Sequence, residues 1–158
     1  MIVDFLGLEP LLIDRLASYV MLYGKPVDVV PYKNLPKLQS GSDRESVLRA
    51  PSLIVSYDGY KVLEASRNKA RVQQYWSVAI CVANVRDRAR TGAREDAGPF
   101  IDQVIGALLG WYPQALADRQ YKPLELTDPA YQPEYGERFS LFPLTFTTDR
   151  VVNGAPLQ

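Results

Sequence analysis

The sequence predicts an α+β domain in which two main helices pack on one face of a mainly antiparallel sheet of about four to five strands. Two observations support this fold class: apolar residues recur at helical spacing in two segments and at alternate positions in several others. The order of these segments is helix, strands, helix, strands, with no internal repeat. At 158 residues the chain is expected to form one domain over residues 1–158, with a disordered tail at about residues 153–158.

The first helix is predicted at residues 9–23, followed by a short strand at residues 27–32. The apolar stripe of the helix consists of Leu12, Leu16, Tyr19, Val20 and Tyr23. Gly24 and Pro26 are expected to end the helix, and Pro31 suits a strand at the edge of a sheet. Ser42 and Glu45 have the spacing of a capping box, which predicts one or two helical turns before Pro51.

A β-hairpin is predicted from residue 52 onward. A run of apolar and β-branched residues leads to Asp58-Gly59, which is a strong turn signal. The chain is expected to return as a second strand with a polar tip around residues 66–69.

Residues 72–85 are predicted to form a central strand. One face carries the bulky residues Trp76, Val78, Ile80 and Val82. The other face carries Tyr75, Ser77, Ala79, Cys81 and Ala83, which are mostly small. Because both faces are largely apolar, both are expected to be covered, and Cys81 is interpreted as a small buried residue.

The second helix is predicted at residues 101–112, with Pro99 in its first turn and Thr91 as an alternative, earlier start. Two more strands are expected within residues 121–128 and 137–152, around a loop rich in proline and tyrosine. Pro143 indicates an edge position or a bulge in the last strand.

Composition excludes several kinds of chemistry. Eighteen basic and 18 acidic residues give a net charge of zero, which argues against a protein that binds DNA through its bulk charge. The chain has no histidine and one cysteine, so neither a histidine-dependent triad nor a Cys/His zinc site can form. It has no phosphate-binding glycine loop, secretory signal or apolar run long enough to cross a bilayer. We expect a cytoplasmic chain with no cofactor, no metal and no membrane contact.

Asp58 and Glu64, with Lys61 and Lys69 close in sequence, leave one enzymatic alternative open: a metal-dependent nuclease in which the two acids hold magnesium. The acid-x-lysine element of such a site is missing, because Glu64 is followed by Ala65 and Ser66. A turn with solvated charges explains these residues more simply.

An arginine cluster follows the central strand: Arg86, Arg88, Arg90 and Arg94. It is interpreted either as a solvated strand-to-helix connection or as a docking surface for carboxylates of a partner protein, to which the planar guanidinium group is suited. Contact with DNA is a third interpretation, weakened by the interspersed Asp87, Glu95 and Asp96.

Five segments, taken in order, resemble phage tail terminator proteins, especially those of Mu-like contractile-tailed phages, and more loosely the minor tail protein that caps the lambda tail. They are "LLIDRLASYV", "APSLIVSYDG", "YWSVAICVANV", "IGALLGWYP" and "ERFSLFPLTFTT", and together they cover roughly residues 9–150. No segment is specific alone, so the resemblance rests on the order of all five.

The resemblance implies a structural virion protein at the tail–neck junction, assembled in the host cytoplasm, without catalysis. Such proteins form a hexameric ring that caps the tail tube, ends its polymerisation and offers an attachment surface for the head and neck. The implied partners are other copies of the chain, the tail tube protein, a neck or connector protein and the tail sheath protein, and no specific nucleic acid. The alternatives are a neck or connector protein of the same virion and a carboxylate-dependent cytoplasmic enzyme.

The expected contacts with a neighbouring subunit or the tube lie on the hairpin and in the arginine cluster. They are Tyr60, Arg67, Lys69, Arg86, Arg88, Arg90 and Arg94. The hairpin is included because its polar tip lies beside aromatic residues, and tyrosine and arginine are common in the cores of protein interfaces.

Overall fold

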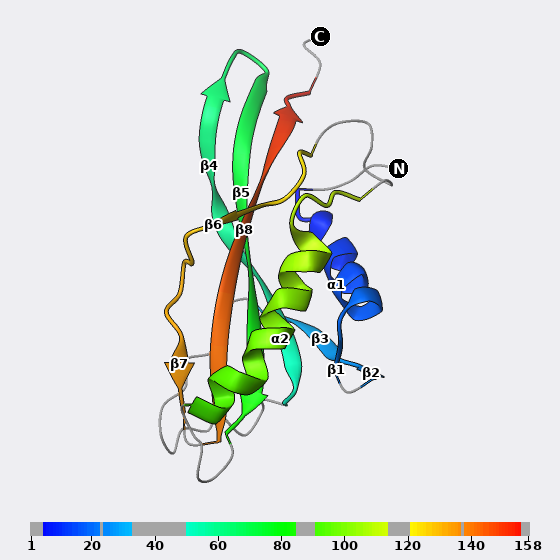
Figure 1. The fold of residues 1–158 in the computed structure, drawn as a ribbon. Helices are drawn as coiled ribbons and strands as arrows, with labels where there is room; N and C mark the ends of the chain where they lie inside the picture. The colour runs from blue at the N-terminus through cyan, green and yellow to red at the C-terminus, as the bar shows by residue number, and fades with distance from the viewer. Residues whose placement is uncertain are drawn as a thin grey trace.

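The computed structural model describes residues 5–22, 24–32, 50–84, 91–113, 121–136 and 138–155, with the side chains of residue 32 and of residues 91–96 left out (Figure 1). Within these residues the elements in chain order are α1 (Leu8–Tyr19), β1 (Met21–Leu22), β2 (Lys25–Pro26), β3 (Asp28–Tyr32), β4 (Ser52–Ala65), β5 (Lys69–Ala83), α2 (Thr91–Leu108), β6 (Glu125–Thr127), β7 (Glu134–Tyr135) and β8 (Phe139–Asn153). The helix, strands, helix, strands order of the sequence is confirmed.

The main sheet is mixed and has six strands, so the expected mainly antiparallel sheet of about four to five strands is refined by one parallel pair and by the strand number. Its order is β3-β4-β5-β8-β6, and β7 also pairs with β8. The pair β3 and β4 is parallel and the other pairs are antiparallel. A parallel pair needs a connection of about a dozen residues or more, which residues 33–51 supply between β3 and β4.

β4 runs straight through the position where a turn was predicted. Asp58-Gly59 forms a register shift inside this strand, between Tyr57 and Gly59, and a second shift lies between Val62 and Glu64. Gly59 has a φ of 107°, a backbone conformation that glycine adopts without steric cost. The Asp-Gly signal therefore marks a β-bulge, and the true turn lies at the predicted polar tip, between Ala65 and Lys69.

β5 is the central strand that the sequence predicts. It pairs with β4 on one side and, over fifteen consecutive register positions, with β8 on the other. Trp76, Val78, Ile80 and Val82 are all buried in one core with residues of α1 and α2. Both helices lie on the same side of the sheet, as expected (Figure 1). On the opposite face Ala79 and Cys81 are fully buried beside Phe139 and Leu141.

α1 is shorter than predicted. It ends at Tyr19, and a small hairpin of β1 and β2 follows. The buried stripe is Leu8, Leu12, Leu16 and Val20, whereas Tyr19 is 48% exposed. The expectation of a stripe through Tyr19 was therefore wrong, because the core follows a strict i, i+4 spacing. Tyr23 lies outside the described residues, as does the predicted capping box.

α2 begins at Thr91, the earlier of the two predicted starts, and ends at Leu108 instead of residue 112. Pro99 lies inside the helix and not in its first turn. A proline removes one backbone hydrogen bond but leaves the apolar spacing intact, and Ala97, Phe100 and Val104 are buried on both sides of it.

β8 carries Pro143 in an unbroken register with β5. On its other side β7 pairs with Ser140 and Leu141, and β6 pairs with residues 145–147, so Pro143 lies in the gap between them. At Pro143 the outer side of β8 has no partner strand among the described residues, which agrees with the predicted edge position. The predicted alternative, a bulge, does not occur there. β8 ends at Asn153, the first residue of the expected tail, and the Gly154 amide donates to the Asn68 carbonyl oxygen at 2.5 Å.

Candidate assembly surfaces

Three strands extend past the helices as a projecting sheet, which we call the arm. It consists of residues 57–65 of β4, 69–75 of β5 and 148–153 of β8 (Figure 1). Phe5 covers the base of the arm, with its ring centroid 5.5 Å from that of Tyr60 and 6.3 Å from that of Tyr57. The predicted hairpin contact therefore belongs to a larger, three-stranded unit, because β8 was not expected to accompany the hairpin.

The tip of the arm carries two of the predicted contact residues, Arg67 and Lys69, and both are exposed. The tip is a hydrogen-bonded turn, in which the Ser66 amide donates to the Lys69 carbonyl oxygen at 2.8 Å. Tyr60 lies further down β4 and is 57% exposed. The structure thus places these three predicted residues on one projecting unit.

The two faces of the arm differ in polarity. Strand register puts Tyr60, Val62 and Val72 on the face that continues into the helix-covered core. The opposite face carries a chain of ion pairs: Arg71 to Glu64 at 3.3 Å, Arg71 to Asp149 at 3.8 Å and Lys122 to Asp149 at 3.2 Å. The pair of Arg71 with Glu64 is largely exposed and contributes about 0–1 kcal/mol, whereas the Asp149 carboxylate is partly buried between Arg71 and Lys122. The ion pairs identify the polar face of the arm.

Asp58, at the bulge of β4, accepts hydrogen bonds from three hydroxyl groups. Ser56 donates at 2.9 Å and Tyr131 at 3.1 Å to one carboxylate oxygen, and Ser77 donates to the other. Ser77 also contacts Thr145 at 2.9 Å, and the Thr145 hydroxyl accepts from the Ala130 amide. This network ties the segment around Tyr131 to β4, β5 and β8, so Asp58 has a structural role. Sequence reasoning missed the network, because it joins residues that lie far apart in the chain.

The same network perturbs Tyr131. Burial is the main cause that raises the pKa of its phenol above the ordinary value, and the nearby charge of Asp58 adds to the effect. A neutral phenol can donate a hydrogen bond to the Asp58 carboxylate, whereas a phenolate would repel that carboxylate. Tyr131 therefore donates to Asp58 throughout the physiological pH range.

Asp58 and Glu64 do not form the acid pair that a metal-dependent nuclease needs. They are separated by six residues of one strand, which at about 3.3 Å per residue places them roughly 15–20 Å apart. Glu64 pairs with Arg71, and Asp58 binds only hydroxyl groups among the contacts described. No group of three or more potential metal ligands occurs in the described part of the chain.

The arginine cluster follows β5 in the sequence. Arg86, Arg88 and Arg90 fall outside the described residues, and Arg94 belongs to α2 with its side chain outside the description. Asn84, the last described residue before them, makes two hydrogen bonds. Its backbone amide donates to the Arg138 carbonyl oxygen at 2.8 Å, and its side-chain amide donates to the Gly136 carbonyl oxygen at 2.6 Å. The 15 residues of β5 span roughly 45–50 Å, so Asn84 lies far from the tip of the arm.

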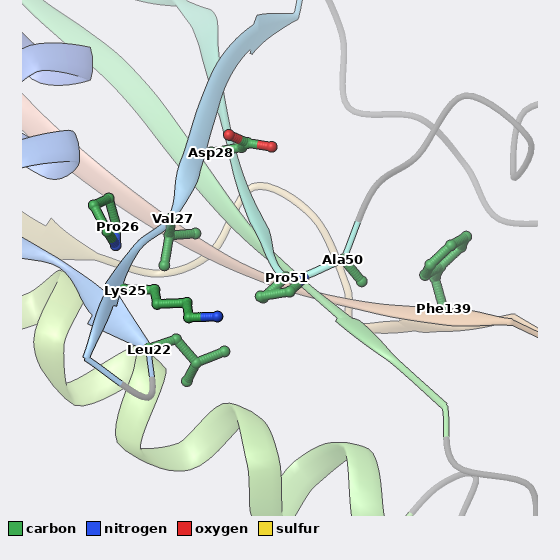
Figure 2. Close-up of a pocket in the computed structure, with 8 residues that line it drawn as sticks. All are labelled: Leu22, Lys25, Pro26, Val27, Asp28, Ala50, Pro51 and Phe139. Carbon is green, nitrogen blue, oxygen red and sulfur yellow. The ribbon is translucent and has the colours of Figure 1, made fainter.

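A pocket of about 650 Å³ lies beside the β1–β2 hairpin (Figure 2). Its lining residues are Leu22, Lys25, Pro26, Val27, Asp28, Ala50, Pro51 and Phe139. The Lys25 ammonium group is directed into the space between Leu22 and Pro51, while the Asp28 carboxylate lies apart from it (Figure 2). The walls are mostly apolar and hold no nucleophile paired with a base, so the pocket has none of the usual equipment of an active site.

Within the described residues, no helix combines the length and the apolar character that a membrane crossing requires.

Comparison with known proteins gives one match over nearly the whole chain. A family model described as phage tail terminator protein matches residues 1–156. No curated protein matches the chain. The matched range includes both the arm and the segment that carries the arginine cluster.

Proposed function

The chain belongs to the phage tail terminator protein family, and we propose that it forms a hexameric ring that caps the tail tube, ends its polymerisation and provides the surface to which the neck attaches. Family membership makes it a structural component of the phage tail, hence of the virion, that interacts with other tail components. The observation that carries the proposal is the family match over residues 1–156. The proposal extends to a contractile, Mu-like tail, to a place at the tail–neck junction and to the absence of catalysis.

The fold is compatible with a ring. The arm lies at one end of β5 and Ala83 at the other end, so one subunit can offer contacts to partners at two separate levels. Contacts between different surfaces of identical subunits close into a ring when the rotation between the subunits allows it. The proposed partners are other copies of the chain, the tube protein, a neck or connector protein and the sheath protein.

The direct test uses purified protein and tail tubes of the same phage. Negative-stain images are expected to contain rings of the diameter of the tube, either free in solution or bound at one end of each tube. Added protein is expected to stop tube growth at the end that it covers. Tubes that lengthen normally with no ring at their ends would contradict the proposal and favour the alternative of a neck or connector protein.

Deletion of residues 66–69 should give a folded protein that no longer forms rings. The tip is exposed and lies outside the helix-covered core, so its removal affects the reach of the arm more than its stability. Circular dichroism and thermal melting would establish the fold, and images would establish the assembly. A matched variant, Arg67→Ala with Lys69→Ala, keeps the length of the turn and removes its two charges. It therefore distinguishes an effect of the length of the arm from an effect of the charge at its tip. Unchanged rings after the deletion would exclude the tip as a contact.

Reversal of two charges in the arginine cluster, Arg86→Glu with Arg90→Glu, should abolish ring formation or attachment to tubes while the melting temperature stays nearly unchanged. Removing one partner of a desolvated ion pair costs about 3–5 kcal/mol, and a ring repeats that loss in every subunit. Lys25→Glu is the control, because it reverses the charge of an exposed residue that lies outside the arm and the arginine cluster. If the double reversal assembles and caps tubes like the wild type, the cluster is a solvated connection.

A further inference from the structure

One long edge of the arm has no strand beside it among the described residues. β3 pairs only with residues 52–56 of β4, whereas residues 57–65 pair with β5 on one side and have no strand on the other within the described part of the chain. Backbone N–H and C=O groups along a strand point alternately to its two sides, so half of those in this stretch face outward. Such an edge is a template for pairing with a further strand.

The edge is regular over a short stretch only. The two bulges of β4 enclose residues 59–62, which pair with β5 at four consecutive register positions. Tyr60 and Val62 lie here and are 57% and 51% exposed, although both continue the apolar face of the core. Lys61 points to the opposite face, a common feature of edges that do not pair indiscriminately.

At the end of β8, the opposite edge of the arm also lacks a partner strand in the described part of the chain. Its outer side is occupied by β7 at residues 140 and 141, by β6 at residues 145–147 and by a bridge from Tyr121 to Arg150. Residues 151–153 follow without an outer partner among the described residues, and Val151 is 38% exposed. The free end of β8 therefore matches the regular run of β4 in length to within one residue.

The two free edges are compatible in direction. β4 and β8 are both antiparallel to β5, so they run the same way on opposite sides of one arm. Two copies can be related by a rotation about an axis that runs along the strands. In that arrangement the β4 edge of one copy meets the β8 edge of the next copy, and the two strands are parallel. The parallel partner β3 already occupies the lower part of the same side of β4.

We propose that residues 59–62 of β4 pair in parallel with residues 151–153 of β8 in a second copy of the chain, so that the arms of neighbouring subunits join into one sheet. Tyr60 and Val62 then pack against the apolar face of the neighbouring arm, where Val152 lies. This inference rests on the proposed ring and adds the strands that form its joint. Because the two edges are different surfaces, the contact is head-to-tail and can close.

Proline substitution tests the backbone contact. Of the consecutive residues Lys61 and Val62, one directs its N–H toward β5 and the other directs it outward, and proline is tolerated in a strand only where the N–H is not needed. We expect Lys61→Pro and Val62→Pro to differ: one should lower the melting temperature, and the other should keep it and lose ring formation. Lys61→Ala, which retains the N–H, should assemble like the wild type. A thermally unaffected proline variant that still forms rings would overturn the proposal.

A disulfide experiment tests the pairing without relying on proline. Val62 and Val152 lie on the same face of the arm by register. After oxidation, a variant with both Val62→Cys and Val152→Cys should form a series of disulfide-linked oligomers up to the closed ring. Each single variant should stay uncross-linked, since Cys81 is fully buried. Dimers from Val62→Cys alone would mean that two β4 edges pair with each other, and the absence of this series in rings bound to tubes would place the joint elsewhere. Either result overturns this inference but leaves the ring intact, whereas a wild type that neither forms rings nor caps tubes contradicts the proposed function itself.

Discussion

Ile80→Ala should be among the most destabilising single substitutions in this chain, with a loss of about 2–5 kcal/mol in the free energy of unfolding. Ile80 is fully buried in β5, between Leu53 of β4 and Phe142 of β8, and the truncation leaves a cavity that the fifteen-residue pairing on its β8 side cannot easily close. For a domain of this size the melting temperature should fall by roughly 4–20 °C.

The measurement is urea or thermal unfolding at a concentration where the protein is monomeric, because assembly raises the apparent stability. Leu109→Ala is the matched control: it removes a side chain of similar size that is 53% exposed, and it should cost less than about 1 kcal/mol. Equal losses for the two variants would mean that β5 does not form the centre of the core.

Asp58→Ala should have the second large effect, about 2–4 kcal/mol, because it leaves the hydroxyl groups of Ser56, Ser77 and Tyr131 without their common acceptor. Glu64→Ala should cost less than about 1 kcal/mol, since the Glu64 side chain is 75% exposed in its pair with Arg71. Asp58→Asn should fall between them, as one acceptor oxygen remains. Denaturant unfolding of the three variants gives the comparison.

The same variants decide the enzymatic alternative. We expect no magnesium-dependent cleavage of DNA by the wild type, and changes in Asp58 or Glu64 that act through folding alone. Reproducible cleavage that both Asp58→Ala and Glu64→Ala abolish, in variants that remain folded, would restore the carboxylate-dependent enzyme as a function. A loss of stability equal for both would contradict the distinct roles given to the two acids.

Local patterns predicted the elements well where one face is buried. The alternation from Trp76 to Val82 identified the central strand, and the spacing of Leu12 and Leu16 identified α1. Asp58-Gly59 was misread because a turn and a bulge use the same residues, and only the register of β4 against β5 distinguishes them. The parallel pair of β3 and β4 was missed for a related reason: partner choice depends on the path of the connection, which leaves no periodicity in the sequence.

The candidate contact residues were predictable only in kind. Exposed Tyr60, Arg67 and Lys69 do lie on one projecting unit, but the part of β8 that completes this unit reads as an ordinary strand in the sequence. The unpaired edges of the arm depend on which of the described strands lie beside β4 and β8, a property of topology that no single segment carries. The arginine cluster stays a prediction.

The pairing of β5 with β8 has a consequence for biosynthesis. Their partner residues are separated by between 56 positions (Ala83 and Phe139) and 84 positions (Lys69 and Asn153) in the chain. At translation rates of about 5–20 residues per second, the β5 edge waits roughly 3–17 s on the ribosome before its partner is made. The central strand thus stays without its β8 partner while about a third to a half of the chain is synthesised, and a chain cut short before residue 139 lacks the β8 side of its core. A chain that ends before residue 139 contains the β4 edge but lacks β8, so it could pair with one neighbour and offer no β8 edge to the next.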